Sequence, residues 1–353
     1  MTAKEAILYQ KLPNDKVKCT ACARYCEIGK GQIGLCGIRA NNNGKLDLLA
    51  YGKVITGHVD PIEKKPVTHY RPGTSIFSIA TTGCNWLCKY CQNSDISQRR
   101  KVEGTDMTPQ EVVNLAKQSG SDGIAYTYNQ PSIFIEFARD CGVVARKNGL
   151  FNVFVSNGYD TPETVNMMNE FLDCITVDFK GNAEPQFSRK YIGIPDPQPI
   201  FETLKEIHRK TKIHVEITDL IIPQVGDNLE YAKNLCKFIY DEFGPDMPIH
   251  FLRFHPDYKM MDFKSTPIPT LEKHYEIAKE VGLNYAYLGN VPGHRLENTY
   301  CPECKKIVIK RYGFDIQGWH LDENNKCNFC SAKIAIEGKL SNDYKQNRFQ
   351  FVF

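Results

Sequence analysis

Three closely spaced cysteines are the first feature of this sequence that could do chemistry. Cys84, Cys88 and Cys91 are separated by three and then two residues. Tight turns can bring cysteines at such intervals to neighbouring irons of one cluster. A 4Fe-4S cluster usually takes four thiolates, so a set of three leaves one iron open to bind and activate a ligand. The spacing therefore predicts a reactive cluster. A zinc site completed by a distant fourth ligand, or a set of buried structural thiols, is the alternative.

The elements around this loop predict an α/β barrel. Residues 75–80 are β-branched, aromatic and small, as in a strand, so the cysteines follow its carboxyl end. A helix over 108–118 begins with a capping box. Further strands are predicted at 123–128, 152–156, 175–179, 213–222, 249–254 and 284–288. Such alternation gives a parallel sheet with right-handed crossovers, curled as a full or partial barrel, whose active site lies at the carboxyl ends of the strands.

Two further sets of cysteines each offer four thiolates. The N-terminal set suits either zinc or an auxiliary iron–sulfur cluster, and both a structural knot and an electron-transfer role remain open. The C-terminal set consists of two Cys-x2-Cys pairs separated by 22 residues, which predicts a zinc ribbon. The N-terminal set is Cys19, Cys22, Cys26 and Cys36, and the C-terminal set is Cys301, Cys304, Cys327 and Cys330. The remaining cysteines, at 141, 174 and 236, are predicted to be ordinary core residues.

Alternating polar side chains on two predicted strands indicate a polar barrel interior. His214, Glu216 and Thr218 share one face of their strand, while the apolar residues between them share the other. This pattern favours a site inside the barrel, because a polar face is unusual on a purely structural strand. Asp178 and Lys180 likewise share a face, and a mutually neutralised structural pair is the alternative for them.

The cysteine loop, with Tyr90 directly before its third cysteine, resembles that of the radical S-adenosylmethionine (SAM) enzymes. Other motifs resemble the radical SAM member of the AmmeMemoRadiSam system, which is related to the activases of glycyl-radical enzymes such as pyruvate formate-lyase. These motifs lie at residues 19–36, 60–66, 91–93 and 288–294. The resemblance implies a partial (β/α)6-type barrel and a 4Fe-4S cluster on the three loop cysteines. It also implies SAM on the open iron, cleaved by one electron to a 5'-deoxyadenosyl radical that abstracts hydrogen.

The resemblance also implies three contacts to SAM outside the cysteine loop. Asp178 and Lys180 match an Asp-x-Lys motif that lies near SAM in the activases. His255 resembles a histidine that lies beside the nucleoside, although a lone histidine is more often a core residue. No catalytic side chain is predicted in addition to these binding groups.

The ends of the second and third barrel strands supply the remaining predicted SAM contacts. Gln130 stands where activases carry a carboxylate for the SAM amino group, so its neutral amide predicts a weaker contact. Asn129 or a backbone carbonyl is the alternative for this role. Ser156 and Asn157 end the third strand and are also predicted to contact SAM, a simple turn being the alternative.

Composition and charge bound the remaining possibilities. The chain has 353 residues, a net charge of +3 and no long apolar stretch, which predicts a cytoplasmic protein with no membrane partner. Nucleic acid is disfavoured as a partner, because there is no long basic run. The charged side chains of residues 60–73 are expected to be exposed to solvent and to have no further role. Three parts are predicted: an N-terminal cysteine-rich domain at 1–73, the barrel at 74–296, and a zinc ribbon with a tail at 297–353.

The predicted function is that of a radical SAM enzyme that takes electrons from an external one-electron reductant. Its substrate is expected to be a protein backbone, as in glycyl-radical activation, or a small molecule. Two other classes are alternatives: an RNA-modifying enzyme that grips nucleic acid with its ribbon, and a metal-binding adaptor. The adaptor hypothesis does not explain a loop with only three cysteines.

Overall fold

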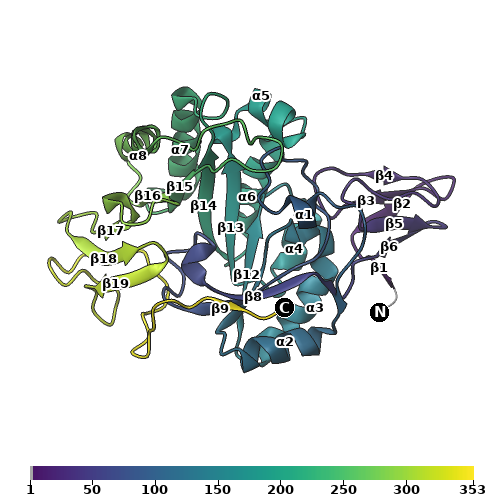
Figure 1. The fold of residues 1–353 in the computed structure, drawn as a ribbon, viewed down its shortest axis with the longest axis horizontal. Helices are drawn as coiled ribbons and strands as arrows, with labels where there is room; N and C mark the ends of the chain where they lie inside the picture. Colours follow the sequence, from purple (N-terminus) through teal and green to yellow (C-terminus); the bar gives the residue numbers. More distant parts are fainter. Residues whose placement is uncertain (1–2) are drawn as a thin grey trace.

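A nine-stranded sheet forms the centre of the protein in the computed structural model, which describes residues 3–353 (Figure 1). Seven neighbouring strands are parallel and follow one another in sequence order from β9 to β16. They are β9 (Ser75–Ala80), β11 (Gly123–Tyr126), β12 (Phe151–Ser156), β13 (Cys174–Lys180), β14 (His214–Ile221), β15 (Ile249–Arg253) and β16 (Ala286–Gly289). These strands confirm the predicted parallel sheet, and it stays open because β16 does not pair with the other edge.

Antiparallel strands close the other side of the sheet. β8 (Thr56–Pro61) pairs with β9, and β20 (Gln350–Phe351), near the C-terminus, pairs with β8. The Phe353 ring packs directly on Gly57. A Cβ atom at position 57 would lie only 2.5 Å from that ring. The last residues of the chain therefore cover the edge that β8 would otherwise expose.

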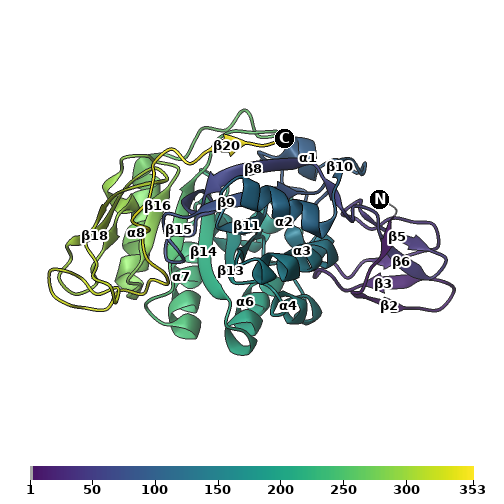
Figure 2. The ribbon, with the colours of Figure 1, turned by 90° about the horizontal axis from the view of Figure 1, so that it is seen from below.

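Helices follow most of the parallel strands and pack beside the sheet (Figure 2). The long ones are α2 (Pro109–Gln118), α3 (Ile135–Lys147), α4 (Pro162–Met168), α6 (Gln198–Lys210), α7 (Leu229–Phe243) and α8 (Ile268–Val281). The capping box predicted for α2 is confirmed, since Thr108 and Glu111 exchange side-chain and backbone hydrogen bonds. Cys141, Cys174 and Cys236 are buried in the core, as predicted. None of the helices in residues 3–353 has the length and apolar character needed to span a bilayer.

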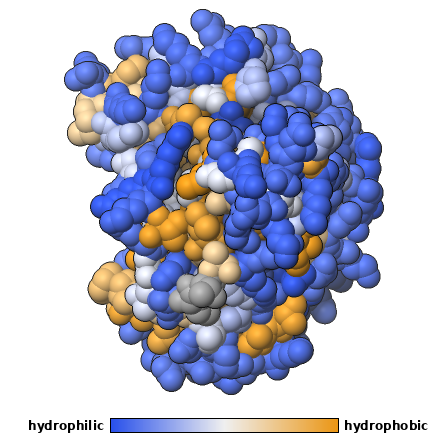
Figure 3. Space-filling view, turned by 90° about the vertical axis from the view of Figure 1, so that its right-hand side faces the viewer, coloured by the Kyte–Doolittle hydropathy of each residue, from blue (hydrophilic) through white to orange (hydrophobic). Residues whose placement is uncertain are grey.

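Small sheets lie at opposite ends of the molecule in both ribbon views (Figures 1 and 2). At the N-terminal end β1 (Lys4–Glu5), β6 (Lys45–Leu48) and β5 (Arg39–Asn42) form one sheet, and β2 (Tyr9–Lys11), β3 (Val17–Cys19) and β4 (Glu27–Ile28) form another. At the C-terminal end β17 (Thr299–Tyr300), β18 (Ile307–Tyr312) and β19 (Asp315–Trp319) form a third. The face on the N-terminal side is mainly hydrophilic, with scattered apolar patches (Figure 3). The predicted domain boundaries stay a prediction.

The polar face of β14 does not form one continuous ligand site. Glu216, near the start of the strand, accepts hydrogen bonds from the backbone nitrogens of Thr68 (2.8 Å) and His69 (2.7 Å) and from His250 Nε2 (2.8 Å). The carboxylate is fully buried and used by protein donors. The prediction of a ligand site on this face is therefore wrong for Glu216. The carboxylate of Glu216 instead anchors the segment before β9 to the amino-terminal end of the barrel. Thr218, further along, bonds to Asp178 instead.

His214 adds a pH-dependent bond between the barrel and the C-terminal part of the chain. Its Nδ1 lies 3.0 Å from Glu337 Oε1, and its Nε2 lies 3.4 Å from Glu216 Oε1. Burial alone would lower the pKa of His214, but hydrogen bonds to the two carboxylates raise it to about 9. The folded pKa exceeds the unfolded one, so the stabilisation is complete below pH 6.5 and is lost as the pH rises through about 9.

We expect His214→Gln to lower the free energy of unfolding by about 1–3 kcal/mol below pH 6.5, because a buried charged hydrogen bond is lost. The difference from the native chain should shrink as the pH rises through about 9. Urea unfolding of both chains from below pH 6.5 to above pH 9 measures this difference in stability. His255→Gln, at an exposed histidine, is the matched control. A difference that does not vary with pH would show that the charge of His214 does not contribute.

Candidate radical SAM site

The loop that carries the three cysteines is fixed by its intervening residues. Trp86 and Tyr90 are buried, whereas Cys84, Cys88 and Cys91 are only half-buried. The Tyr90 ring stacks on Phe187 with a centroid distance of 5.9 Å. Backbone hydrogen bonds from positions 87 and 89 to the carbonyls at 192 and 191, both 2.9 Å, tie the loop to the segment after β13. The cysteines therefore lie at the carboxyl end of β9, as predicted.

The chemistry of the three thiols suits a metal cluster. Burial raises the pKa of Cys84 to about 11, and burial together with the neighbouring cysteines raises that of Cys88. Thiols whose pKa is raised in this way stay neutral near pH 7 unless a metal replaces the proton. Thiolates are the ligands that hold iron–sulfur clusters. The set present in the loop thus fits a 4Fe-4S cluster with one open iron, and its assignment as ligands stays a prediction.

Asp178 and Lys180 lie beside the cysteine loop, and their predicted contact with SAM stays a prediction. Lys180 Nζ is 2.9 Å from Asp178 Oδ2, and both side chains are mostly buried. Burial alone would lower the pKa of Lys180, but Asp178 and, to a smaller extent, Cys88 and Asp219 raise it. The lysine therefore stays charged. This arrangement places a cation next to the cysteine loop, where it could face an anionic group of a ligand.

Gln130, Ser156 and Asn157 come together in one buried network. The amide nitrogen of Gln130 lies within hydrogen-bond distance of Ser132 Oγ (2.8 Å), Ser156 Oγ (2.8 Å) and Asp160 Oδ1 (3.1 Å), so these three acceptors share its two N–H groups. Its amide oxygen accepts from the backbone nitrogen of Asn157 at 2.7 Å. Both ends of the amide are thus used by the protein, so a direct contact with SAM would have to replace one of these bonds. The geometry favours a positioning role for Gln130.

The same network reaches the cysteine loop. Asn157 Nδ2 donates to Asn85 Oδ1 at 2.8 Å, and Asn85 directly follows the first cysteine. Asn129 Nδ2 donates to the carbonyl of Gly83 at 2.9 Å, while its Oδ1 is buried without a partner in residues 3–353. The Nδ2 of Asn85 is likewise buried and unpartnered in that range. Such orphaned polar atoms beside the loop mark a place where a ligand could supply the missing bonds.

Sequence reasoning missed Asp160, which completes this network. Its Oδ2 accepts from Ser156 Oγ at 3.2 Å, and its Oδ1 accepts from Ser132. Burial raises the pKa of Asp160 to about 6, although the two hydroxyls and Gln130 act in the opposite direction. Asp160 lies four residues beyond the strand end, which is the one signal in the sequence that could have drawn attention to it.

We expect Gln130→Glu to destabilise the chain by about 1–3 kcal/mol, because it removes the amide donors and places a second carboxylate beside Asp160. On resemblance alone, an added carboxylate would be expected to strengthen SAM binding. Thermal unfolding and anaerobic SAM titration separate the two outcomes. Gln110→Glu, on the exposed start of α2, is the matched control. Tighter SAM binding at unchanged stability would instead place Gln130 on the SAM ammonium.

His255 lies apart from the buried network. Its ring is largely exposed, with Nδ1 at 3.2 Å from Asp257 Oδ2. The loop that carries it still touches the cysteine loop, because the backbone nitrogen of Lys259 donates to the carbonyl of Lys89 at 2.8 Å. The predicted contact of His255 with the nucleoside stays a prediction.

A buried charge cluster lies beside β8, where solvated charges were expected. Asp60 accepts from Lys64, Lys65 and the hydroxyl of Tyr128, each at 2.7 Å. Asp60 and Lys65 are almost fully buried, so the expectation of solvated charges is wrong for them. Burial alone would raise the pKa of Asp60, but the two lysines hold it well below its usual value. Burial lowers the pKa of Lys65 to about 8 despite its carboxylate partner.

The C-terminal cysteines form a compact group that fits zinc. The Sγ atoms of Cys301 and Cys330 are 3.6 Å apart, and those of Cys304 and Cys327 are 3.7 Å apart. Four sulfurs placed tetrahedrally at the Zn–S bond length lie about 3.8 Å from one another. All four sulfurs lie within 4.8 Å of one another. The geometry therefore supports the predicted zinc ribbon.

Comparison with known proteins agrees with this site. Residues 78–239 match the model of the radical SAM superfamily. An uncharacterized protein of Methanocaldococcus jannaschii, MJ0808, is 44% identical over 336 residues, which cover 94% of this chain and 99% of that protein. The chain belongs to the radical SAM superfamily, and its members are enzymes that use a 4Fe-4S cluster and SAM.

More distant similarities concern only parts of the chain. The ribosomal RNA large subunit methyltransferase Cfr of Bacillus velezensis is 22% identical over 228 residues, which cover 61% of this chain and 65% of Cfr. Among solved structures, a domain of a pyruvate-formate lyase-activating enzyme from Bacteroides vulgatus is 17% identical with a TM-score of 0.41. That match covers 48% of this chain and 100% of the domain.

Proposed function

We propose that this chain cleaves SAM reductively on a cluster held by Cys84, Cys88 and Cys91, and that the radical formed abstracts hydrogen from a protein. When bound, the cluster and SAM would together supply a 5'-deoxyadenosyl radical, which would take a hydrogen atom from the substrate to give 5'-deoxyadenosine. The observation that carries this proposal is the three-thiol loop at the carboxyl end of β9, beside a buried lysine and aspartate.

The residues around the loop have distinct roles in this proposal. Lys180 would face the carboxylate of SAM, held in place by Asp178 at 2.9 Å. The buried Gln130 and Asn157 would hold the loop through Asn85. Tyr90, Phe187 and Phe254 form an aromatic wall next to the third cysteine, with centroids 5.9 and 6.4 Å from Tyr90. Such a wall would keep water from a reactive radical.

The surface beside the loop supports a macromolecular substrate. Leu87, Tyr258 and Met261 expose 39%, 41% and 64% of their surface, although all three are large and apolar. They lie on two loops joined by the hydrogen bond between Lys259 and Lys89. Exposed apolar side chains that lie together on a surface are typical of protein-binding sites.

The position of the zinc ribbon argues against its use as a nucleic-acid grip over this site. Residues near its C-terminal cysteines bind the segment before β9, with Glu337 N donating to the carbonyl of His69 at 2.8 Å. His69 in turn bonds to Glu216 at the amino-terminal end of the barrel. The part from 297 to 353 carries nine Lys and Arg against seven Asp and Glu, which is a small excess for a polyanion. A structural role for the ribbon is therefore the better-supported one.

Deuterium transfer tests the substrate class. The anaerobically reconstituted chain is incubated with unlabelled SAM, a reductant and an extract of the native host grown in deuterated medium. We expect deuterium in 5'-deoxyadenosine when the extract is treated with RNase and filtered to remove small molecules, and none when it is treated with protease. The opposite result would favour the RNA-modifying alternative, and label supplied only by the small-molecule filtrate would contradict a protein substrate.

A further inference from the structure

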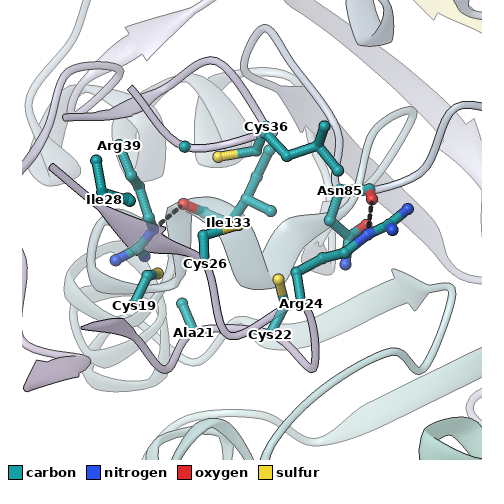
Figure 4. Close-up of a pocket in the computed structure, with 12 residues that line it drawn as sticks. Cys19, Ala21, Cys22, Arg24, Cys26, Ile28, Cys36, Arg39, Asn85 and Ile133 are labelled. Atoms are coloured by element: carbon teal, nitrogen blue, oxygen red, sulfur yellow. Dashed lines mark hydrogen bonds between the residues drawn. The ribbon is translucent and has the colours of Figure 1, made fainter. Parts of the chain in front are cut away.

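The four N-terminal cysteines surround one cavity on the side of the barrel loop. Cys19, Cys22, Cys26 and Cys36 all line one cavity, and Figure 4 shows them arranged around it. All but Cys26 are buried. Arg24, Arg39 and Asn85 contribute to the same wall. Four thiols that converge on an internal space form a built site for a metal group.

The N-terminal sulfurs are grouped less closely than those of the zinc ribbon. In the C-terminal ribbon, all four sulfurs lie within 4.8 Å of one another. No other such group of potential metal ligands occurs in residues 3–353. No three of the N-terminal sulfurs meet this condition, although a tetrahedral zinc site holds its sulfurs about 3.8 Å apart. A 4Fe-4S cluster binds each thiolate at a different corner iron, so its ligands are spread more widely. The three thiols of the barrel loop likewise form no such close group in the described residues.

Backbone hydrogen bonds order the segments that carry the N-terminal thiols. The backbone nitrogen of Cys19 donates to the carbonyl of Cys26 at 2.9 Å, and that of Gly37 donates to the carbonyl of Gly34 at 2.9 Å. The loops that present the thiols to the cavity are therefore part of the folded structure.

Positive charge near the cavity complements a cluster with four thiolates. Arg39 is paired with Glu136 and contributes little net charge. Arg24 instead donates to two backbone carbonyls, those of Asn85 (2.9 Å) and Gly193 (2.6 Å), and has no carboxylate partner in the part of the chain described. Its uncompensated charge favours a group with net negative charge beside it.

The cavity also adjoins the barrel loop directly. Asn85, which follows Cys84, lines the cavity and receives the bond from Arg24 through its carbonyl. Gly83, which precedes Cys84, packs so closely on the carbonyl of Cys36 that an added Cβ would collide with it. The residues on either side of Cys84 therefore contact the N-terminal cysteine site: Gly83 touches Cys36, and Asn85 lines the cavity.

We propose that Cys19, Cys22, Cys26 and Cys36 hold a second 4Fe-4S cluster, which passes single electrons to the barrel cluster; the destination of those electrons rests on the function proposed above. Because all four irons of this cluster have a thiolate, none is open to bind a substrate, and electron exchange is the chemistry that remains. The four N-terminal cysteines would thus hold a group that could pass one electron from the external reductant to the group held by the barrel loop. No bond forms or breaks in this step.

The metal content of two complementary variants tests the site itself. One variant replaces Cys84, Cys88 and Cys91 by alanine, and the other replaces the four N-terminal cysteines. After anaerobic reconstitution and reduction with dithionite, we expect the first variant to keep about four irons and a paramagnetic resonance signal that SAM does not change. The second should keep only the signal that SAM perturbs. Zinc without iron in the first variant would overturn the proposal, whatever the barrel loop binds.

The native chain provides a check that does not depend on the folding of either variant. It should hold about eight irons in two clusters, together with one zinc. Replacement of Cys301, Cys304, Cys327 and Cys330 should remove the zinc alone. An iron content of about four in the fully reconstituted native chain would contradict a second cluster of this type.

The electron-transfer role is tested by a choice of reductants. In the variant without the four N-terminal cysteines, release of 5'-deoxyadenosine driven by a reduced flavodoxin should be lost, while release driven by dithionite should be retained. Cys26→Ala, which removes the least buried of the four ligands, is the milder variant. Equal loss with both reductants would mean that the N-terminal site is structural and would overturn the relay.

Discussion

Replacement of Cys88 by alanine is expected to abolish the release of 5'-deoxyadenosine from SAM. Only two thiolates would then remain in the barrel loop, too few to hold a cluster with a single open iron. Cys88 also lies beside Lys180, so its loss would disturb the charged group next to the cluster. Chromatography of an anaerobic reaction with SAM and dithionite measures the product, and paramagnetic resonance reports the cluster.

Cys141→Ala is the control for this experiment. Cys141 is a fully buried cysteine on α3 and lies in none of the three cysteine sets. Its replacement leaves a small cavity and should keep both the cluster signal and the product. A Cys88→Ala chain that still releases 5'-deoxyadenosine at the native rate would show that the barrel loop does not hold the reactive cluster.

The parallel sheet could be predicted because its strands are short apolar runs between helices. All seven predicted strands occur, with ends displaced by at most two residues. The antiparallel strand β20 could not be predicted in the same way. It is two residues long and forms only because the C-terminal tail returns to β8, which lies far earlier in the sequence. Such pairing depends on tertiary contacts and has no local pattern.

The metal ligands of the site could be predicted, but the side chains that hold them could not. Cysteine spacing is local, so Cys84, Cys88 and Cys91 could be identified from the sequence. The partners of Gln130 come from the segments after two different strands, and its amide is used up only once those segments meet. Asp60 is buried because Tyr128, 68 positions away, covers it together with the lysines that follow it. Burial of a charge depends on such distant partners.

The buried pair of Arg39 and Glu136 should give the largest loss of stability for residues that are not metal ligands. Arg39 Nη1 lies 3.0 Å from Glu136 Oε1, and both side chains are 2% exposed or less. The pair joins β5 to α3, and Glu136 also accepts from the backbone nitrogens of Ile7 (3.0 Å) and Leu8 (3.4 Å). It therefore ties the N-terminal sheets to the barrel.

We expect Arg39→Leu to lower the free energy of unfolding by about 3–5 kcal/mol, because it leaves the carboxylate of Glu136 buried without its cation. Arg99→Leu, which removes an exposed pair with Glu103, should cost no more than about 1 kcal/mol. Anaerobic urea unfolding compares the two. The double variant Arg39→Leu/Glu136→Gln should recover part of the loss, since its neutral amide oxygen can still accept from the backbone at Ile7. If Arg39→Leu is no more harmful than Arg99→Leu, the buried pair does not hold the two parts of the chain together.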